Sequence, residues 1–166
     1  AVEDHGPHMS ISTDNDILEG VLSECGRQAD GDLLVLPTIP FGLDEHHMDF
    51  PGTISVDIQT TLAYLTQVAV SVARHGFTHI LIVNGHGSNH SICDLAARDC
   101  VIKTGMICAS TTVNAAVDPS LVRDVLDAGR EASSAPDESI AIQIVAAARP
   151  GDSALAPSIT PYAESS

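Results

Sequence analysis

The first candidate for a functional residue is a histidine, His86, that follows a run of apolar residues. Residues 80–83 are four consecutive apolar residues, and the segment Asn84-Gly85-His86-Gly87 breaks that run. A short apolar run bounded by glycine is typical of a buried strand in a parallel sheet. His86 is therefore expected at the carboxyl end of a strand, where open α/β sheets bind their ligands. A turn histidine that faces water is the alternative.

A second polar group lies near the N-terminus, far from His86 in the sequence. It contains Glu3, His5, His8 and Asp14. Carboxylates and imidazoles in this mixture suit zinc, manganese or iron. An acidic, frayed terminus is the alternative explanation. From these residues alone, a metal site and a frayed terminus both stay open.

A third polar group lies in the long irregular segment 39–53. This segment contains Asp44, Glu45, His46, His47 and Asp49. A connection of this length inside a compact domain is often functional. A charged turn facing solvent explains the same composition, and both interpretations stay open.

Apolar periodicity predicts alternating helices and strands around these groups. Helices are predicted over 14–28, 56–75, 89–104, 119–128 and 137–148, and strands over 32–38, 77–83 and 106–112. Such alternation indicates βαβ units with right-handed crossovers. We expect a three-layer α/β/α fold with a mainly parallel sheet that contains at least four parallel strands. One domain would span residues 1–149, followed by a Pro/Ser/Ala-rich tail over 150–166.

Composition excludes several kinds of partner. The 166-residue chain carries a net charge of −15, which disfavours nucleic acid and anionic membranes. No apolar run reaches the length of a membrane span, and no secretory signal is expected. These features, with four cysteines in no C-x-x-C pair, predict a cytoplasmic protein with reduced thiols.

The three polar groups together resemble the creatininase (creatinine amidohydrolase) family. Its members carry E-x-H-G-P-H-L-P with T-D, then Y-G-x-S-x-E-H-x-x-F-P-G-T, then N-G-H-G-G-N. The matching segments here are residues 3–10 with Thr13-Asp14, residues 41–53, and residues 84–89. The resemblance covers roughly residues 2 to 115, and it implies a creatininase-like fold.

The resemblance also implies a two-metal site. Glu3, Asp14 and His86 would hold one divalent metal, and His5 with a bridging Asp14 would hold the other. The metals would be zinc, manganese or iron, and two of them can activate one water and polarise one carbonyl oxygen. The family's remaining ligand is a glutamate where this chain has Ser88. Asp137 is the predicted replacement.

A catalytic histidine of the family is missing from this chain. Family members carry it in H-A-G-x-x-E-T-S, and the nearest match, residues 132–139, has Ala132 in its place. Another register puts residues 127–129 on H-A-G, again without histidine. His47 or Glu138 is predicted to protonate the leaving nitrogen instead. His47 aligns with the histidine of the E-H pair in the second motif, and His46 stands in place of its glutamate.

These features predict a metal-dependent amidohydrolase that cleaves a non-peptide C–N bond with a metal-activated water. The substrate would be a small cyclic amide or a formamide. The alternative is a creatininase-derived binding or structural subunit that has lost catalysis. A homo-oligomer is expected, and the family resemblance implies a hexamer.

Overall fold

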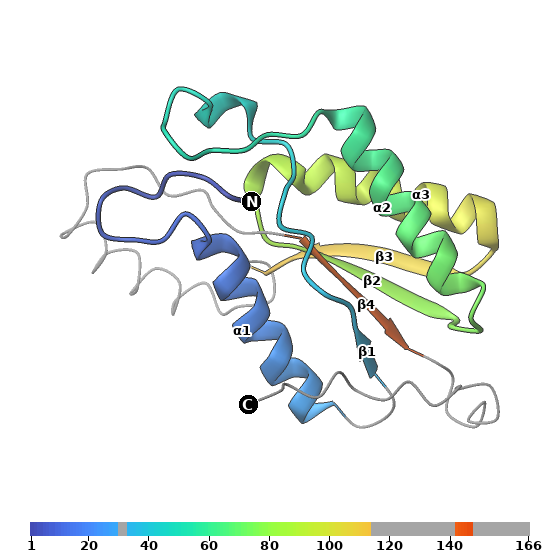
Figure 1. The fold of residues 1–166 in the computed structure, drawn as a ribbon. Helices are drawn as coiled ribbons and strands as arrows, with labels where there is room; N and C mark the ends of the chain where they lie inside the picture. Colours follow the sequence, from blue (N-terminus) through green and yellow to red (C-terminus); the bar gives the residue numbers. More distant parts are fainter. Residues whose placement is uncertain (30–32, 114–141, 148–166) are drawn as a thin grey trace.

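In the computed structural model of the protein, residues 1–29, 33–113 and 142–147 are described, and they form a mixed α/β fold (Figure 1). The helices are α1 (Thr13–Gln28), α2 (Ile58–Ala73) and α3 (His90–Thr104), and the strands are β1 (Leu33–Val35), β2 (His79–Asn84), β3 (Ile107–Thr112) and β4 (Ile142–Ala147). The first three predicted helices and the three predicted strands are therefore confirmed, with ends displaced by a few residues. The predicted helix over 119–128 and the tail over 150–166 lie outside the described residues.

The strands form one sheet in the order β1-β4-β2-β3. Strands β2 and β3 pair in parallel, with His79 opposite Ile107 and Asn84 opposite Thr112. Strand β4 lies between β1 and β2 and runs antiparallel to both. Three strands thus share one direction and β4 opposes them, so the described residues contain three of the expected four parallel strands.

Strand β4 also corrects the helix predicted over 137–148, since residues 142–147 are strand. Its sequence, Ile-Gln-Ile-Val-Ala-Ala, contains three β-branched residues, which favour strands. A short apolar stretch cannot be assigned to helix or strand from periodicity alone. Pairing within the sheet makes this segment a strand, because β4 has backbone partners in β1 on one side and in β2 on the other.

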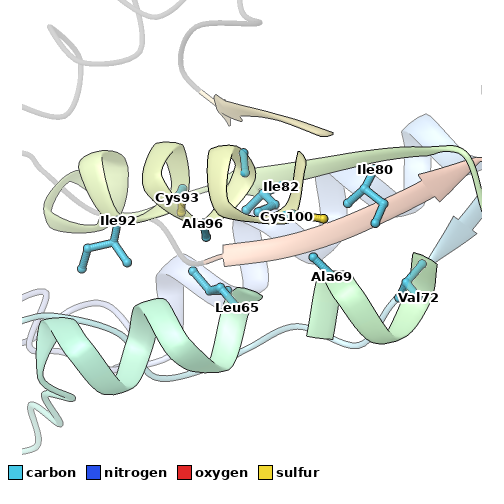
Figure 2. Close-up of a cluster of buried hydrophobic side chains, with 10 residues drawn as sticks. Leu65, Ala69, Val72, Ile80, Ile82, Ile92, Cys93, Ala96 and Cys100 are labelled. Atoms are coloured by element: carbon cyan, nitrogen blue, oxygen red, sulfur yellow. The ribbon is translucent and has the colours of Figure 1, made fainter. Parts of the chain in front are cut away.

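Helices cover both faces of the sheet (Figure 1). A cluster of buried side chains lies on each face, and Figure 2 shows the one between the sheet and α2 and α3. On one face, α2 and α3 pack against Ile80 and Ile82 of β2. Their buried contributions are Leu65, Ala69 and Val72 from α2, and Ile92, Cys93, Ala96, Ala97 and Cys100 from α3. On the other face, α1 packs against Val83. Successive side chains of a strand point to opposite faces, so β2 serves both clusters.

Local signals in the sequence fix where the helices begin and end. Asp57 caps α2, and its side chain accepts a hydrogen bond from the Thr60 N–H at 3.0 Å. Gly105 ends α3 with a φ of +70°, a left-handed conformation that glycine adopts readily. Among the helices described, none combines the length and apolar character needed to cross a membrane.

Candidate metal centre

Backbone hydrogen bonds hold the N-terminal segment that contains Glu3 and His5. The Glu3 N–H donates to the Ile11 carbonyl at 3.1 Å, and the Ile54 N–H donates to the Val2 carbonyl at 2.9 Å. The segment is thereby held between Ile11, which precedes α1, and Ile54, in the connection that precedes α2. This leaves the Glu3 side chain only 1% exposed, where a carboxylate needs compensating partners.

Asp14 enters the same region from the first turn of α1 and is completely buried. His5 Nε2 lies 2.9 Å from Asp14 Oδ1, and His5 Nδ1 lies 3.1 Å from the Glu3 carbonyl oxygen. Both ring nitrogens of His5 therefore have partners. The hydrogen bond with Asp14 raises the pKa of His5 despite the opposing effect of burial.

His86 follows the carboxyl end of β2, as the sequence predicted. The Asn84 side-chain oxygen accepts a hydrogen bond from the His86 N–H at 3.0 Å and so fixes the turn. The imidazole is buried, and its Nδ1 lies 3.2 Å from Glu3 Oε1 and 3.5 Å from Asp14 Oδ2. Glu3, Asp14 and His86 thus converge, with one donor atom from each lying within 4.8 Å of the others.

The connection between β1 and α2 brings a further carboxylate, Asp44, into the region. The Leu43 N–H donates to Asn89 Oδ1 at 2.9 Å, and the Asp44 N–H donates to Ser55 Oγ at 3.0 Å. At Gly42 a Cβ atom would lie 2.5 Å from Asn89 Nδ2, so only glycine allows this approach. Asn89 and Gly42 therefore set the course of the connection just before Asp44.

Asp44 and His47 lie beside the cluster of Glu3, Asp14 and His86. Asp44 is completely buried, and its Oδ1 lies 3.0 Å from His47 Nδ1 and 3.5 Å from His86 Nε2. His47 Nδ1 also contacts Glu3 Oε2. Asp44, His46 and His47 form a second set of donors within 4.8 Å of one another.

His47 was predicted from the sequence as a site residue, whereas Asp44 was not. Asp44 stands at the serine position of the second family motif, so the motif gave no reason to choose it. The pattern of a carboxylate followed by imidazoles two and three positions later, in His46 and His47, was the available signal. Burial of Asp44 could be recognised only once the connection was placed against Asn89.

Burial and close contacts shift the pKa values within the cluster. Burial opposes ionisation of Glu3 and Asp14, but contacts with histidines outweigh it and lower the pKa of both carboxyls. Burial likewise opposes a charged His86, yet contacts with Asp14 and Glu3 raise its pKa to about 9. For Asp44, burial and then the neighbouring Glu3 raise the pKa to about 7. Without a metal, His86 therefore carries a proton between two carboxylates near neutral pH.

The donor atoms of this cluster fit a divalent cation. Glu3 Oε1, Asp14 Oδ2 and both ring nitrogens of His86 are buried without a hydrogen bond in the described part of the chain. His86 Nδ1 lies 3.2 Å from Glu3 Oε1 and 3.5 Å from Asp14 Oδ2. Ligand atoms of a tetrahedral zinc ion with bonds of about 2.1 Å lie about 3.4 Å apart, which is a similar distance. Among described residues, arginine and lysine form their ion pairs elsewhere. A bound cation would take the place of the His86 proton as the positive partner of these carboxylates.

Asp137 and Glu138, the predicted replacement ligand and proton donor, lie outside the described residues. Both alternative matches to the family's H-A-G motif, over residues 127–139, lie there as well. Their predicted roles remain predictions.

A buried cluster of carboxylates and imidazoles beside the carboxyl end of a strand defines an α/β protein with a candidate metal centre. The chain belongs to the creatininase family, because the family's sequence model, described as creatinine amidohydrolase, matches residues 1–149.

Two curated proteins are similar to part of this chain. The mycofactocin precursor peptide peptidase of Mycolicibacterium smegmatis is 33% identical over 93 residues, covering 54% of this chain and 37% of the peptidase. The creatinine amidohydrolase of Pseudomonas putida is 31% identical over 109 residues, covering 60% of this chain and 41% of that enzyme. The matched region therefore spans about two fifths of each relative.

Proposed function

We propose that the protein is a metal-dependent hydrolase that cleaves an amide-type C–N bond. The observation that carries this proposal is the convergence of Glu3, Asp14 and His86 in a buried cluster. One carboxylate oxygen of each acid and both ring nitrogens of His86 lack hydrogen bonds in the described part of the chain. Family membership supports hydrolysis, since one relative is named a creatinine amidohydrolase and another a peptidase.

In this proposal Glu3, Asp14 and His86 hold one divalent cation, which is zinc, manganese or iron. His5 joins Asp14 on the side where the family resemblance implies a second cation, with Asp137 as its replacement ligand. A divalent cation bound at such a site lowers the pKa of a water ligand and polarises a carbonyl oxygen. The lowered pKa values of Glu3 and Asp14 keep both carboxylates ionised for this purpose.

A leaving nitrogen needs a proton, and we propose His47 as its donor in the state with one bound cation. The His47 side chain is 30% exposed while its Nδ1 contacts Glu3 and Asp44. The ring therefore joins the buried carboxylates to the open side of the cluster, where a substrate would arrive. Glu138 is the second candidate for this role.

The proposed substrate is a cyclic amide or a formamide. A peptide amide is the second candidate, favoured by the similarity to the mycofactocin precursor peptide peptidase. The test is turnover by zinc-loaded and manganese-loaded protein on a panel with all three classes, followed by liquid chromatography. His86→Ala should abolish turnover, and His90→Ala, which removes an exposed imidazole from α3, should retain it.

An absence of turnover across the panel, with metal bound, would contradict the hydrolase proposal. It would favour the alternative, a creatininase-derived binding or structural subunit.

We also propose that the protein forms a homo-oligomer, and by family resemblance a hexamer. Light scattering at micromolar concentration tests this. A mass equal to a single 17.3 kDa chain would contradict it.

A further inference from the structure

We propose that the second divalent cation of this protein binds between Asp44, His46 and His47, in the connection between β1 and α2. The inference rests on the proposed function, because this cation would lie beside the one held by Glu3, Asp14 and His86. One carboxylate with two imidazoles is a donor set that suits zinc, iron and manganese. The proposal therefore moves the second cation away from His5 and Asp137.

Asp44 provides the strongest evidence for this position. Its side chain is completely buried, and neither carboxylate oxygen forms a hydrogen bond in the described part of the chain. Its Oδ1 lies 3.0 Å from His47 Nδ1 and 3.6 Å from His46 Nδ1, so three potential ligand atoms converge. A buried carboxylate without hydrogen bonds is costly unless a positive charge meets it.

The His5 side is a poorer place for the second cation. Both ring nitrogens of His5 already have partners, in Asp14 Oδ1 and the Glu3 carbonyl oxygen. A cation there would have to replace one of these hydrogen bonds, as a cation at the loop position would replace the contact of His47 Nδ1 with Glu3 Oε2. The difference between the two positions lies in the remaining ligands. Ser88 stands where family members have their glutamate ligand, and a neutral hydroxyl brings no charge to offset the desolvation of a divalent ion.

The geometry around Ser88 indicates how the chain compensates for the missing glutamate. Ser88 Oγ lies 3.4 Å from His46 Nδ1, so the imidazole of His46 reaches the neighbourhood from which that glutamate would act. The ring centroids of His46 and His86 are 6.2 Å apart, which keeps both cation positions in one centre. His46 itself replaces the glutamate of the second motif, so two of the departures from the family pattern meet at this point.

Binding here changes the role of His47. Its Nδ1 cannot hold a proton and a cation at once, so His47 acts as proton donor only when the second position is empty. With both cations bound, Glu138 is left as the proton donor suggested by the sequence. Glu3 then connects the two positions, because Oε1 faces His86 and Oε2 contacts His47.

The test measures zinc per chain in the full-length protein after equilibrium dialysis, by elemental analysis. His46→Ala and Asp44→Asn should each lose one zinc equivalent relative to the unmodified protein, while Asp137→Asn and the control His90→Ala should lose none. His46 is 47% exposed, so its replacement is expected to leave the fold intact even if Asp44→Asn does not. Circular dichroism verifies folding of each variant.

Three other results are informative. Full zinc content in His46→Ala with loss in Asp137→Asn would overturn the inference in favour of the His5 side. A single zinc that only His86→Ala removes would also overturn it, while leaving the proposed first site standing. A single zinc that His46→Ala removes and His86→Ala retains would support the loop position and contradict the proposed first site.

Discussion

Glu3 Oε1 lies 3.2 Å from His86 Nδ1, although Glu3 belongs to the N-terminal segment and His86 follows β2. Asp14, from the start of α1, lies 3.5 Å from the same nitrogen. In the metal-free protein this makes His86 a buried cation between carboxylates. Folding of the metal-free protein therefore depends on a proton that a bound metal would replace.

The first prediction concerns pH. The pKa of His86 is raised from 6.5 to about 9, so its favourable contacts are fully present below pH 6.5 and lost as pH rises through 9. The pKa of Asp44 is raised from 3.8 to about 7, so ionisation of Asp44 in the folded protein also lowers stability as pH rises towards 7. The melting temperature of EDTA-treated protein should therefore fall between pH 6 and pH 9. Thermal unfolding followed by circular dichroism measures this.

Added zinc provides the control for the pH experiment. A bound cation favours the neutral ring of His86 and the ionised carboxylates, so it should raise the melting temperature most at high pH. A melting temperature of metal-free protein that rises between pH 6 and pH 9 would contradict the described cluster.

The second prediction concerns the approach of Gly42 to Asn89. Gly42→Ala places a Cβ 2.5 Å from Asn89 Nδ2 and 2.7 Å from its Oδ1, so Asn89 must move and release the Leu43 N–H. Overpacking of this kind costs about 1–3 kcal/mol of unfolding free energy. Because Leu43 precedes Asp44, zinc affinity should also fall. Urea unfolding and zinc titration measure the two effects.

Gly20→Ala is the matched control for that variant. Gly20 lies exposed in α1, and nothing lies within 4 Å of a Cβ built there. Alanine in a helix interior is more favourable than glycine by about 0.5–1 kcal/mol, so this variant should be slightly more stable. Equal stability of the two variants would contradict the Gly42–Asn89 contact.

The third prediction concerns the core between the sheet and α2 and α3. Ile82 is completely buried, so Ile82→Ala should lower the unfolding free energy by about 2–5 kcal/mol. Ile102, on the outer side of α3, is 81% exposed, and Ile102→Ala should change it by less than about 0.5 kcal/mol. Urea unfolding of both variants is the measurement. Similar losses in both would show that β2 is placed wrongly.

Periodicity and turn residues were enough to predict much of this fold. The Ile80–Val83 run predicted β2, and Gly105 predicted the end of α3. In both places the local sequence agrees with the structure. Strand β4 was missed because its assignment depends on partners in β1 and β2, which are distant in sequence. Its antiparallel direction is likewise a property of the whole sheet.

The candidate site shows the same division between local and distant information. Glu3, Asp14 and His86 were chosen from motif spacing, and the fold brings them together. Asp44 carries no local sign of burial, since its neighbours Glu45 and His46 are exposed. Its desolvation follows from the contact of the connection with Asn89, which no sequence window contains.

The most direct test of the metal centre is the metal content of the purified protein, measured per chain by elemental analysis. The unmodified protein and His90→Ala should each contain at least one equivalent of zinc, manganese or iron. His86→Ala should lose metal while keeping its helical and strand content by circular dichroism. Metal content in His86→Ala equal to that of the unmodified protein, or no metal in the unmodified protein even after incubation with zinc, would contradict the account.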